Sequence, residues 1–155
     1  PAEPMLSIAR KKVEAASLEN EISLVLGLID DVSDKNFDAA ISILVMQFLP
    51  DNGAKLNFLK GISNRLLPGA PVILVDLEGE IGSDEYNTLN AAWKNQQLFI
   101  RSESDRVKKE FIVREKEVHF ISQKRIEFLL EEAGFFKIHK FFKAYLFGGY
   151  VAIKR

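Results

Sequence analysis

The alternation of short apolar runs with amphipathic segments constrains the fold more than any other feature. Three runs have the length and apolar content of buried strands: ISLVL (22–26), FDAAISIL (37–44) and PVILVD (71–76). Between the last two runs, apolar residues recur at helical spacing, and Asp51 is placed to cap the helix. Strand, helix and strand in close succession are typical of a parallel α/β sheet.

The C-terminal part of the chain predicts a different kind of connection. Ser122 is placed to cap a helix that Gly134 ends. The runs FFKIHKFF (135–142) and LFGGYVAI (146–153) follow, and the few residues between them cannot form a helical crossover. These two strands are therefore predicted to be antiparallel. The expected fold class is an α/β sheet that closes with an antiparallel hairpin.

Composition bounds the size and the chemistry of the protein. The 155 residues suffice for one domain with its own core, and the absence of repeats and linkers predicts a single domain over 1–155. The 22 acidic and 21 basic residues nearly cancel, which gives no support to a polyanion partner. The lack of cysteine excludes disulfides and thiolate ligands, and we expect no metal site. No apolar run is long enough for a membrane span, and a cytoplasmic location is expected.

Two further helical regions complete the prediction. PAEPMLSIARKK (1–12) has the spacing of the first turns of an amphipathic helix, with Pro4 in the first turn. Residues 83–118 are predicted to form two helices, the second of them highly charged.

Three phrases within this order of elements carry a resemblance to a known family. FDAAISILVMQFLPD (37–51), LLPGAPVILVD (66–76) and EEAGF (131–135) resemble the class I S-adenosylmethionine-dependent methyltransferases. Within that superfamily the chain is most similar to the type 12 small-molecule enzymes, and more distantly to methyltransferases that act on a tRNA base. The resemblance implies a Rossmann-like sheet of strand order 3-2-1-4-5-7-6, S-adenosylmethionine as cofactor and a small-molecule methyl acceptor. The chain could also associate with a second copy of itself as a homodimer.

Two features of the family have no match in this sequence. The glycine-rich turn after the first family strand and the ribose-binding acid after the second are both absent, and Met5 and Leu6 match the start of the next helix. We therefore expect strands one and two to be absent from this chain, which would be a C-terminal portion of a longer methyltransferase. Alternatively, the first visible strand shifts to pair with the second, or another chain fills the gap. These residues alone are expected to bind the cofactor poorly.

The resemblance assigns candidate cofactor residues position by position. The loop after the first predicted strand would hold the adenine ring, and the end of the next strand would hold the methionine portion. The candidates are Met5, Leu28, Ile29, Asp30 and Asp31 for adenine, and Ser42, Ile43, Leu44 and Gln47 for the methionine portion. On the residues alone, a solvated loop is the simpler explanation of the aspartates, and a polar residue that opens a helix explains Gln47 equally well.

Methyl transfer needs alignment of the acceptor and, for an oxygen or nitrogen acceptor, a base. Asp76 and His119 are the candidate catalytic residues, although a turn aspartate and a packed histidine are the simpler interpretations. Residues 83–118 would form a helical lid over the acceptor. Candidate substrate residues are Tyr86, Trp93, Arg101 and Tyr145, and the first two belong to an aromatic stripe that is also typical of a core.

Two other functions fit parts of the sequence. A non-catalytic interaction module derived from the same fold would use an open sheet edge for pairing. A nucleotide-binding oxidoreductase fits less well, because a closing antiparallel hairpin is atypical of that fold.

Overall fold

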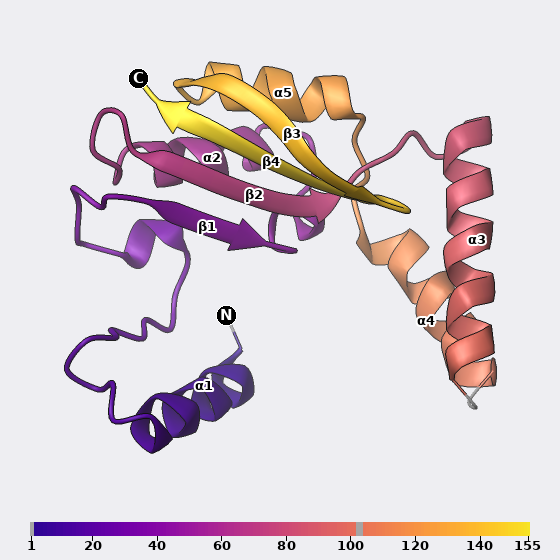
Figure 1. The fold of residues 1–155 in the computed structure, drawn as a ribbon, viewed down its shortest axis with the longest axis horizontal. Coiled ribbons are helices and arrows are strands. Elements are labelled where there is room, and N and C mark those ends of the chain that lie inside the picture. Colours follow the sequence, from indigo (N-terminus) through magenta and orange to yellow (C-terminus); the bar gives the residue numbers. More distant parts are fainter. Residues whose placement is uncertain (1, 102–103) are drawn as a thin grey trace. The chain divides into compact units, whose positions relative to one another are not determined.

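The computed structural model describes residues 2–101 and 104–155. The chain divides into two compact units, one that ends at Asp34 and one that spans Lys35–Arg155. Each unit is described by itself below, and the elements are labelled in Figure 1. The single domain over 1–155 that we expected stays a prediction.

The first unit contains the predicted N-terminal helix. Helix α1 spans Glu3–Ala15, with Pro4 in its first turn and with no buried residue. Its N-cap is Ala2, whose side chain makes no capping hydrogen bond. A 3₁₀ turn at Ile29–Asp31 (η1) follows, closed by the Asp31 carboxylate, which accepts a hydrogen bond from the Leu28 N–H at 2.7 Å.

The prediction of a strand at 22–26 is wrong. These residues form no strand and pair with none in the described part of the chain. A strand is stabilised by the backbone ladder that it shares with a neighbour, so apolar content alone does not make one.

The second unit is built on a four-stranded sheet of order β1-β2-β4-β3 (Figure 1). The first pair is parallel and the other two pairs are antiparallel. The strands are β1 (Ala40–Ile43), β2 (Pro71–Leu77), β3 (Phe135–Ala144) and β4 (Phe147–Lys154). The parallel pair and the closing hairpin are both confirmed. β1 is shorter than predicted, because Phe37 makes only an isolated bridge to Leu66.

Helices α2 (Ala54–Ser63) and α5 (Gln123–Glu132) lie on one side of the sheet (Figure 1). Val72, Leu74 and Tyr150 face them and are buried with the apolar faces of both helices. Ser122 caps α5 by accepting a hydrogen bond from the Arg125 N–H, as predicted. Asp51 does not cap α2: the N-cap is Gly53 at φ 104°, and the Asp51 carboxylate forms an ion pair with Arg125 instead.

Residues 83–118 form two helices, as predicted: α3 (Asp84–Ile100) and α4 (Ser104–Glu117). Ser83 caps α3 through the Tyr86 N–H. The two helices pack together through Arg114, whose guanidinium carbon lies 3.9 Å from the centre of the Trp93 ring and 3.7 Å from that of Phe111. This arrangement fixes α4 against α3 beside the end of the sheet (Figure 1).

Strand β1 lies at an edge of the sheet and is apolar on its less covered face. Ile41 and Ile43 alternate with the buried Ser42 and are 68% and 58% exposed. No described helix is long and apolar enough to cross a membrane.

Candidate functional site

The carboxyl ends of β1 and β2 form the centre of the candidate site. β1 ends where Leu44 adopts a positive φ of 56° while its N–H donates to the Val75 carbonyl at 2.8 Å. The chain then forms a 3₁₀ turn at Met46–Phe48 (η2). Ligands of open α/β sheets bind at this edge, where the strands end.

Gln47 is the polar residue that this turn buries. Its side chain is only 7% exposed, and its Oε1 atom has no hydrogen-bond partner among the described residues. A buried carboxamide oxygen without a partner costs free energy, so such an atom is often completed by a ligand or a water molecule.

Gln47 lines a largely apolar cavity of about 490 Å³ between η2 and α4, which we call the Gln47 cavity. Phe48, Val113 and Val118 contribute its apolar wall. The charged residues that line it are Arg106, Lys109, Glu110, Arg114 and Glu117. Its volume lies within the range of small-molecule sites.

Asp76, a predicted catalytic residue, does not line this cavity but is bonded to the main chain of Gln47. It is fully buried at 0% exposure, and its carboxylate accepts hydrogen bonds from the Gln47 N–H at 3.1 and 3.2 Å and from the Leu77 N–H at 2.9 Å. Burial raises the pKa of the Asp76 carboxyl to about 6, although these N–H groups and Lys55 favour the charged form. These contacts favour a positioning role, and its role as a base stays a prediction.

His119, the second predicted catalytic residue, follows α4. Its backbone N–H donates to the Gln47 carbonyl at 2.8 Å, which ties the chain just after α4 to η2. Its side chain is exposed, so it is not the packed histidine that its apolar neighbours suggested. Val118, the residue before it, lines the Gln47 cavity.

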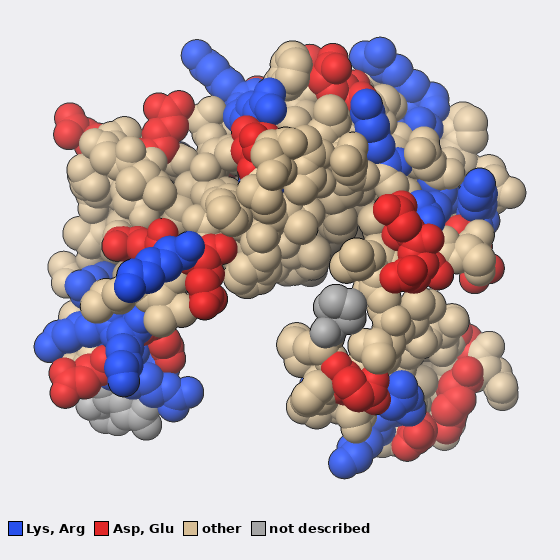
Figure 2. Space-filling view, turned by 180° about the vertical axis from the view of Figure 1, so that it is seen from behind, with Lys and Arg blue, Asp and Glu red and all other residues tan. Residues whose placement is uncertain are grey.

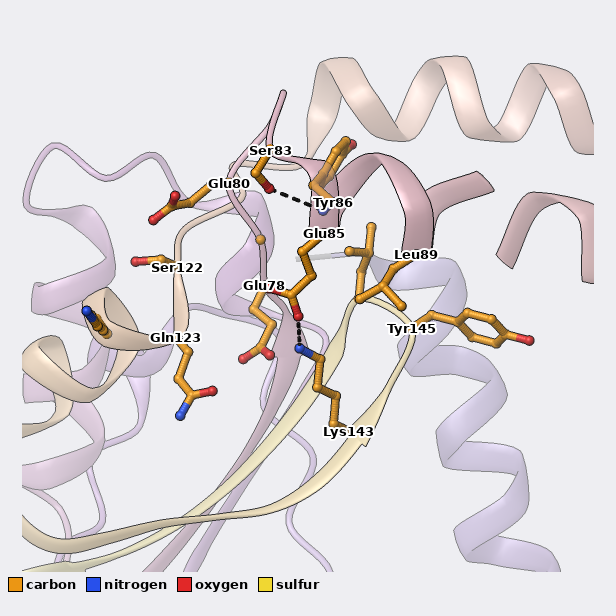
Figure 3. Close-up of a pocket in the computed structure, with 13 residues that line it drawn as sticks. Glu78, Glu80, Ser83, Glu85, Tyr86, Leu89, Ser122, Gln123, Lys143 and Tyr145 are labelled. Atoms are coloured by element: carbon orange, nitrogen blue, oxygen red, sulfur yellow. Dashed lines mark hydrogen bonds and ion pairs between the residues drawn. The ribbon is translucent and has the colours of Figure 1, made fainter. Parts of the chain in front are cut away.

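A second, smaller cavity of about 280 Å³ brings together two predicted substrate residues, Tyr86 and Tyr145 (Figure 3). It lies among the end of β2, the start of α3 and the turn between β3 and β4. Lys143 reaches across it to form an ion pair with Glu85, and the Tyr86 hydroxyl points away from both (Figure 3). Burial raises the pKa of that hydroxyl.

Glu78 at the floor of this cavity is a residue that sequence reasoning missed. It is 4% exposed and is bonded to both the Lys140 ammonium and the Tyr150 hydroxyl. Burial raises the pKa of the Tyr150 hydroxyl, and the hydrogen bond to the Glu78 carboxylate raises it further. No signal in the sequence marked it, because Glu78 directly follows β2, where a charged residue is ordinarily exposed.

In the second unit, Trp93 and Arg101 line neither cavity. Trp93 is stacked on Tyr145 and packs against Phe147, and Arg101 forms an ion pair with Glu110. In the first unit, Met5 is 72% exposed. The remaining cofactor candidates are divided between the units: Leu28, Ile29, Asp30 and Asp31 belong to the first, and Ser42, Ile43 and Leu44 to the second.

The distribution of charge gives no support to a polyanion site. Acidic and basic side chains are interspersed on the face shown in Figure 2, without a continuous basic area. Among the described residues, no group of three or more His, Asp or Glu side chains could hold a metal ion.

No family model and no curated protein matches the sequence. Solved structures do match. A possible exported protein from Bordetella parapertussis is 18% identical with a TM-score of 0.71, over 96% of this chain and 49% of that one. The S-adenosylmethionine-dependent methyltransferase SibL is 17% identical with a TM-score of 0.66, over 96% and 40%. An O-methyltransferase family protein from Burkholderia thailandensis is 11% identical with a TM-score of 0.64, over 94% and 40%.

The chain has a methyltransferase-like fold. These likenesses run through nearly the whole chain but, at such low identity, show the fold alone. The chain spans less than half the length of each of these three proteins. The methyltransferase-like fold that the sequence motifs predicted is confirmed at this level.

Proposed function

We propose that the protein transfers a methyl group from S-adenosylmethionine to a small-molecule acceptor. The observation that carries the proposal is the Gln47 cavity: an apolar space at the carboxyl ends of β1 and β2, with a buried carboxamide oxygen that has no described partner. The methyltransferase fold supplies the reaction class, and the cavity supplies a place for an acceptor.

The residues at the end of β1 fit the proposed cofactor. Ser42 Oγ is a buried oxygen without a hydrogen-bond partner in the described ranges, so it can accept from a polar group of the cofactor. We propose that Ser42, Ile43 and Leu44 contact the methionine portion, and contact of adenine with Met5, Leu28, Ile29, Asp30 and Asp31 stays a prediction. Bound S-adenosylmethionine would supply an electrophilic sulfonium methyl group.

The contribution of the chain to this reaction is alignment. The Gln47 carboxamide would accept a hydrogen bond from the acceptor's O–H or N–H, which holds the nucleophile in one orientation. The apolar wall of Phe48, Val113 and Val118 offers a surface for the apolar part of the acceptor. His119, beside this wall, is the proposed recipient of the proton.

The names of the matched structures support a small molecule as the acceptor. One is a mitomycin 7-O-methyltransferase, and another, from Planctomyces limnophilus, was solved in complex with apigenin. The formal net charge of −1 and the mixed charges in Figure 2 favour a small molecule over a tRNA base.

The test is a transfer assay with a labelled methyl donor on the product of the complete reading frame, against separate metabolite and tRNA pools. We expect label in the metabolite fraction, and a loss of about 10²-fold in transfer for Gln47→Ala. Gln96→Ala is the matched control, because Gln96 is an exposed glutamine on α3. Absence of both transfer and S-adenosylhomocysteine binding would contradict the proposal, and label in the tRNA fraction would replace the acceptor class.

One observation favours a second function, a non-catalytic interaction module. β1 has one described partner strand, and its Ile41 and Ile43 side chains are largely exposed. Such a module would associate through this edge without binding the cofactor. Calorimetry of the product of the complete reading frame with S-adenosylhomocysteine separates the two functions, because the module is expected to show no binding heat.

A further inference from the structure

Lys55 is a buried lysine to which the proposed mechanism gives no role. It lies in the first turn of α2 and is 1% exposed. Lysine is almost never fully buried unless its ammonium is paired, because transfer of the charge out of water is costly. Its Nζ donates to the Met46 carbonyl oxygen at 2.9 Å. The ammonium is therefore held against the main chain of η2.

Asp76 holds the other end of the same peptide group. The Met46 carbonyl and the Gln47 N–H belong to one peptide unit, and the Asp76 carboxylate accepts the hydrogen bond from that N–H. A peptide dipole is negative at its oxygen and positive at its N–H. The ammonium thus faces the negative end and the carboxylate faces the positive end.

We propose that Lys55 and Asp76 are positioning residues that lock the Met46–Gln47 peptide unit in one orientation and so fix Gln47 at the wall of its cavity. The link to an acceptor rests on the proposed function, whereas the lock itself does not. A flipped peptide unit would turn its oxygen toward a carboxylate and its N–H toward an ammonium. Both contacts would be repulsive at a site with little water to screen them.

The surrounding charges are consistent with this lock. Attraction to Asp76 and Asp51 favours the charged form of Lys55, against the larger effect of burial, which lowers the pKa of Lys55. Of these two acids, Asp51 is already bound to Arg125 of α5. In the described part of the chain, no side-chain cation is bonded to Asp76, which interacts with Lys55 through its charge. Burial of the Lys55 side chain alone would not require the Asp76 carboxylate at the opposite end of the Met46–Gln47 peptide unit.

The test is amide NMR on this chain without cofactor or acceptor. In the wild type, the Gln47 and Leu77 N–H resonances should titrate together with a midpoint near pH 6, the pKa of the Asp76 carboxyl. Lys55→Met keeps the aliphatic length and removes the charge, so the midpoint should rise. Lys60→Met, on the exposed side of the same helix, is the matched control and should leave it unchanged.

Amide hydrogen exchange gives a second readout that does not depend on Lys55→Met folding. Asp76→Asn is nearly isosteric and should abolish the titration at Gln47 and raise its exchange rate by about tenfold, while the β2 and β4 amides stay protected. A midpoint that Lys55→Met leaves unchanged, or unaltered Gln47 exchange in Asp76→Asn, would each overturn the proposal. Because no methyl transfer is measured, failure of the proposed function would leave these results unaffected.

Discussion

Gly148 of β4 provides the sharpest test of the packing around Glu78. A Cβ atom at this position would lie 2.6 Å from Glu78 Cδ and still closer to Oε2, inside the 3.0 Å that Cβ atoms keep from their neighbours. The carboxylate is bonded to Lys140 and to Tyr150, so it cannot move aside without breaking those contacts. Glycine is therefore required at 148 for reasons of space.

The expected cost of Gly148→Ala is about 1–3 kcal/mol of unfolding free energy, the usual cost of overpacking a core. Glu78→Ala leaves the buried Tyr150 hydroxyl without its partner and should also cost about 1–3 kcal/mol. In the double variant, the alanine at 148 meets no carboxylate. Its stability should therefore be close to that of Glu78→Ala alone, with a coupling of about 1–3 kcal/mol between the two sites.

Urea unfolding gives the unfolding free energy of the wild type, the two single variants and the double variant. It is followed by circular dichroism and by the fluorescence of the single tryptophan, Trp93. Gly149→Ala is the control, because a Cβ atom there meets Phe141 and Phe142 and not Glu78. Its effect on the unfolding free energy should therefore add to that of Glu78→Ala. A neutral Gly148→Ala, or full additivity in the double variant, would refute the reasoning.

Three further predictions concern a helix cap, a buried acid and the joint between α3 and α4. Ser122→Ala removes the hydrogen-bond acceptor for the Arg125 N–H and should lower the urea midpoint of unfolding, at a cost of about 1 kcal/mol, whereas Ser122→Asp should retain most of the stability. Because burial raises the pKa of Asp76 from 3.8 to about 6, the folded state holds this proton more tightly than the unfolded state. Its contribution to stability should fall as the pH rises from about 4 to 6, by about 3 kcal/mol in total, and the difference between wild type and Asp76→Asn in urea unfolding isolates it. Arg114→Lys loses the planar contact with Trp93 and Phe111 and should cost about 1–2 kcal/mol and shift the Trp93 emission; an unchanged spectrum would contradict the observed stacking.

The parts of the fold that could be predicted from the sequence depend on short-range signals. The hairpin at the C-terminus follows from two apolar runs with a short link, and the start of α5 follows from a serine cap. The parts that failed depend on partners distant in the sequence. The strand expected at 22–26 lacks a described neighbour to pair with, and Asp51 is bound to Arg125, 74 residues away, instead of capping α2.

The candidate site divides in the same way. Gln47 was found because a family motif places a functional residue there, and the structure adds that its carboxamide is buried beside a cavity. Lys55 and Glu78 could not be found, because hydropathy patterns place charged residues at the surface. Only the three-dimensional arrangement shows that each has a bonding partner in the interior.

The place of β4 in the sheet also determines when the protein can fold. β4 lies between β2 and β3, and Pro71 of β2 pairs with Ile153, so the central ladder joins segments far apart in sequence. During synthesis, β2 therefore leaves the ribosome well before its antiparallel partner exists. Contacts of such long sequence separation slow folding and prolong the exposure of apolar strands. The sheet is therefore expected to form only after β4 has left the ribosome and can insert between β2 and β3.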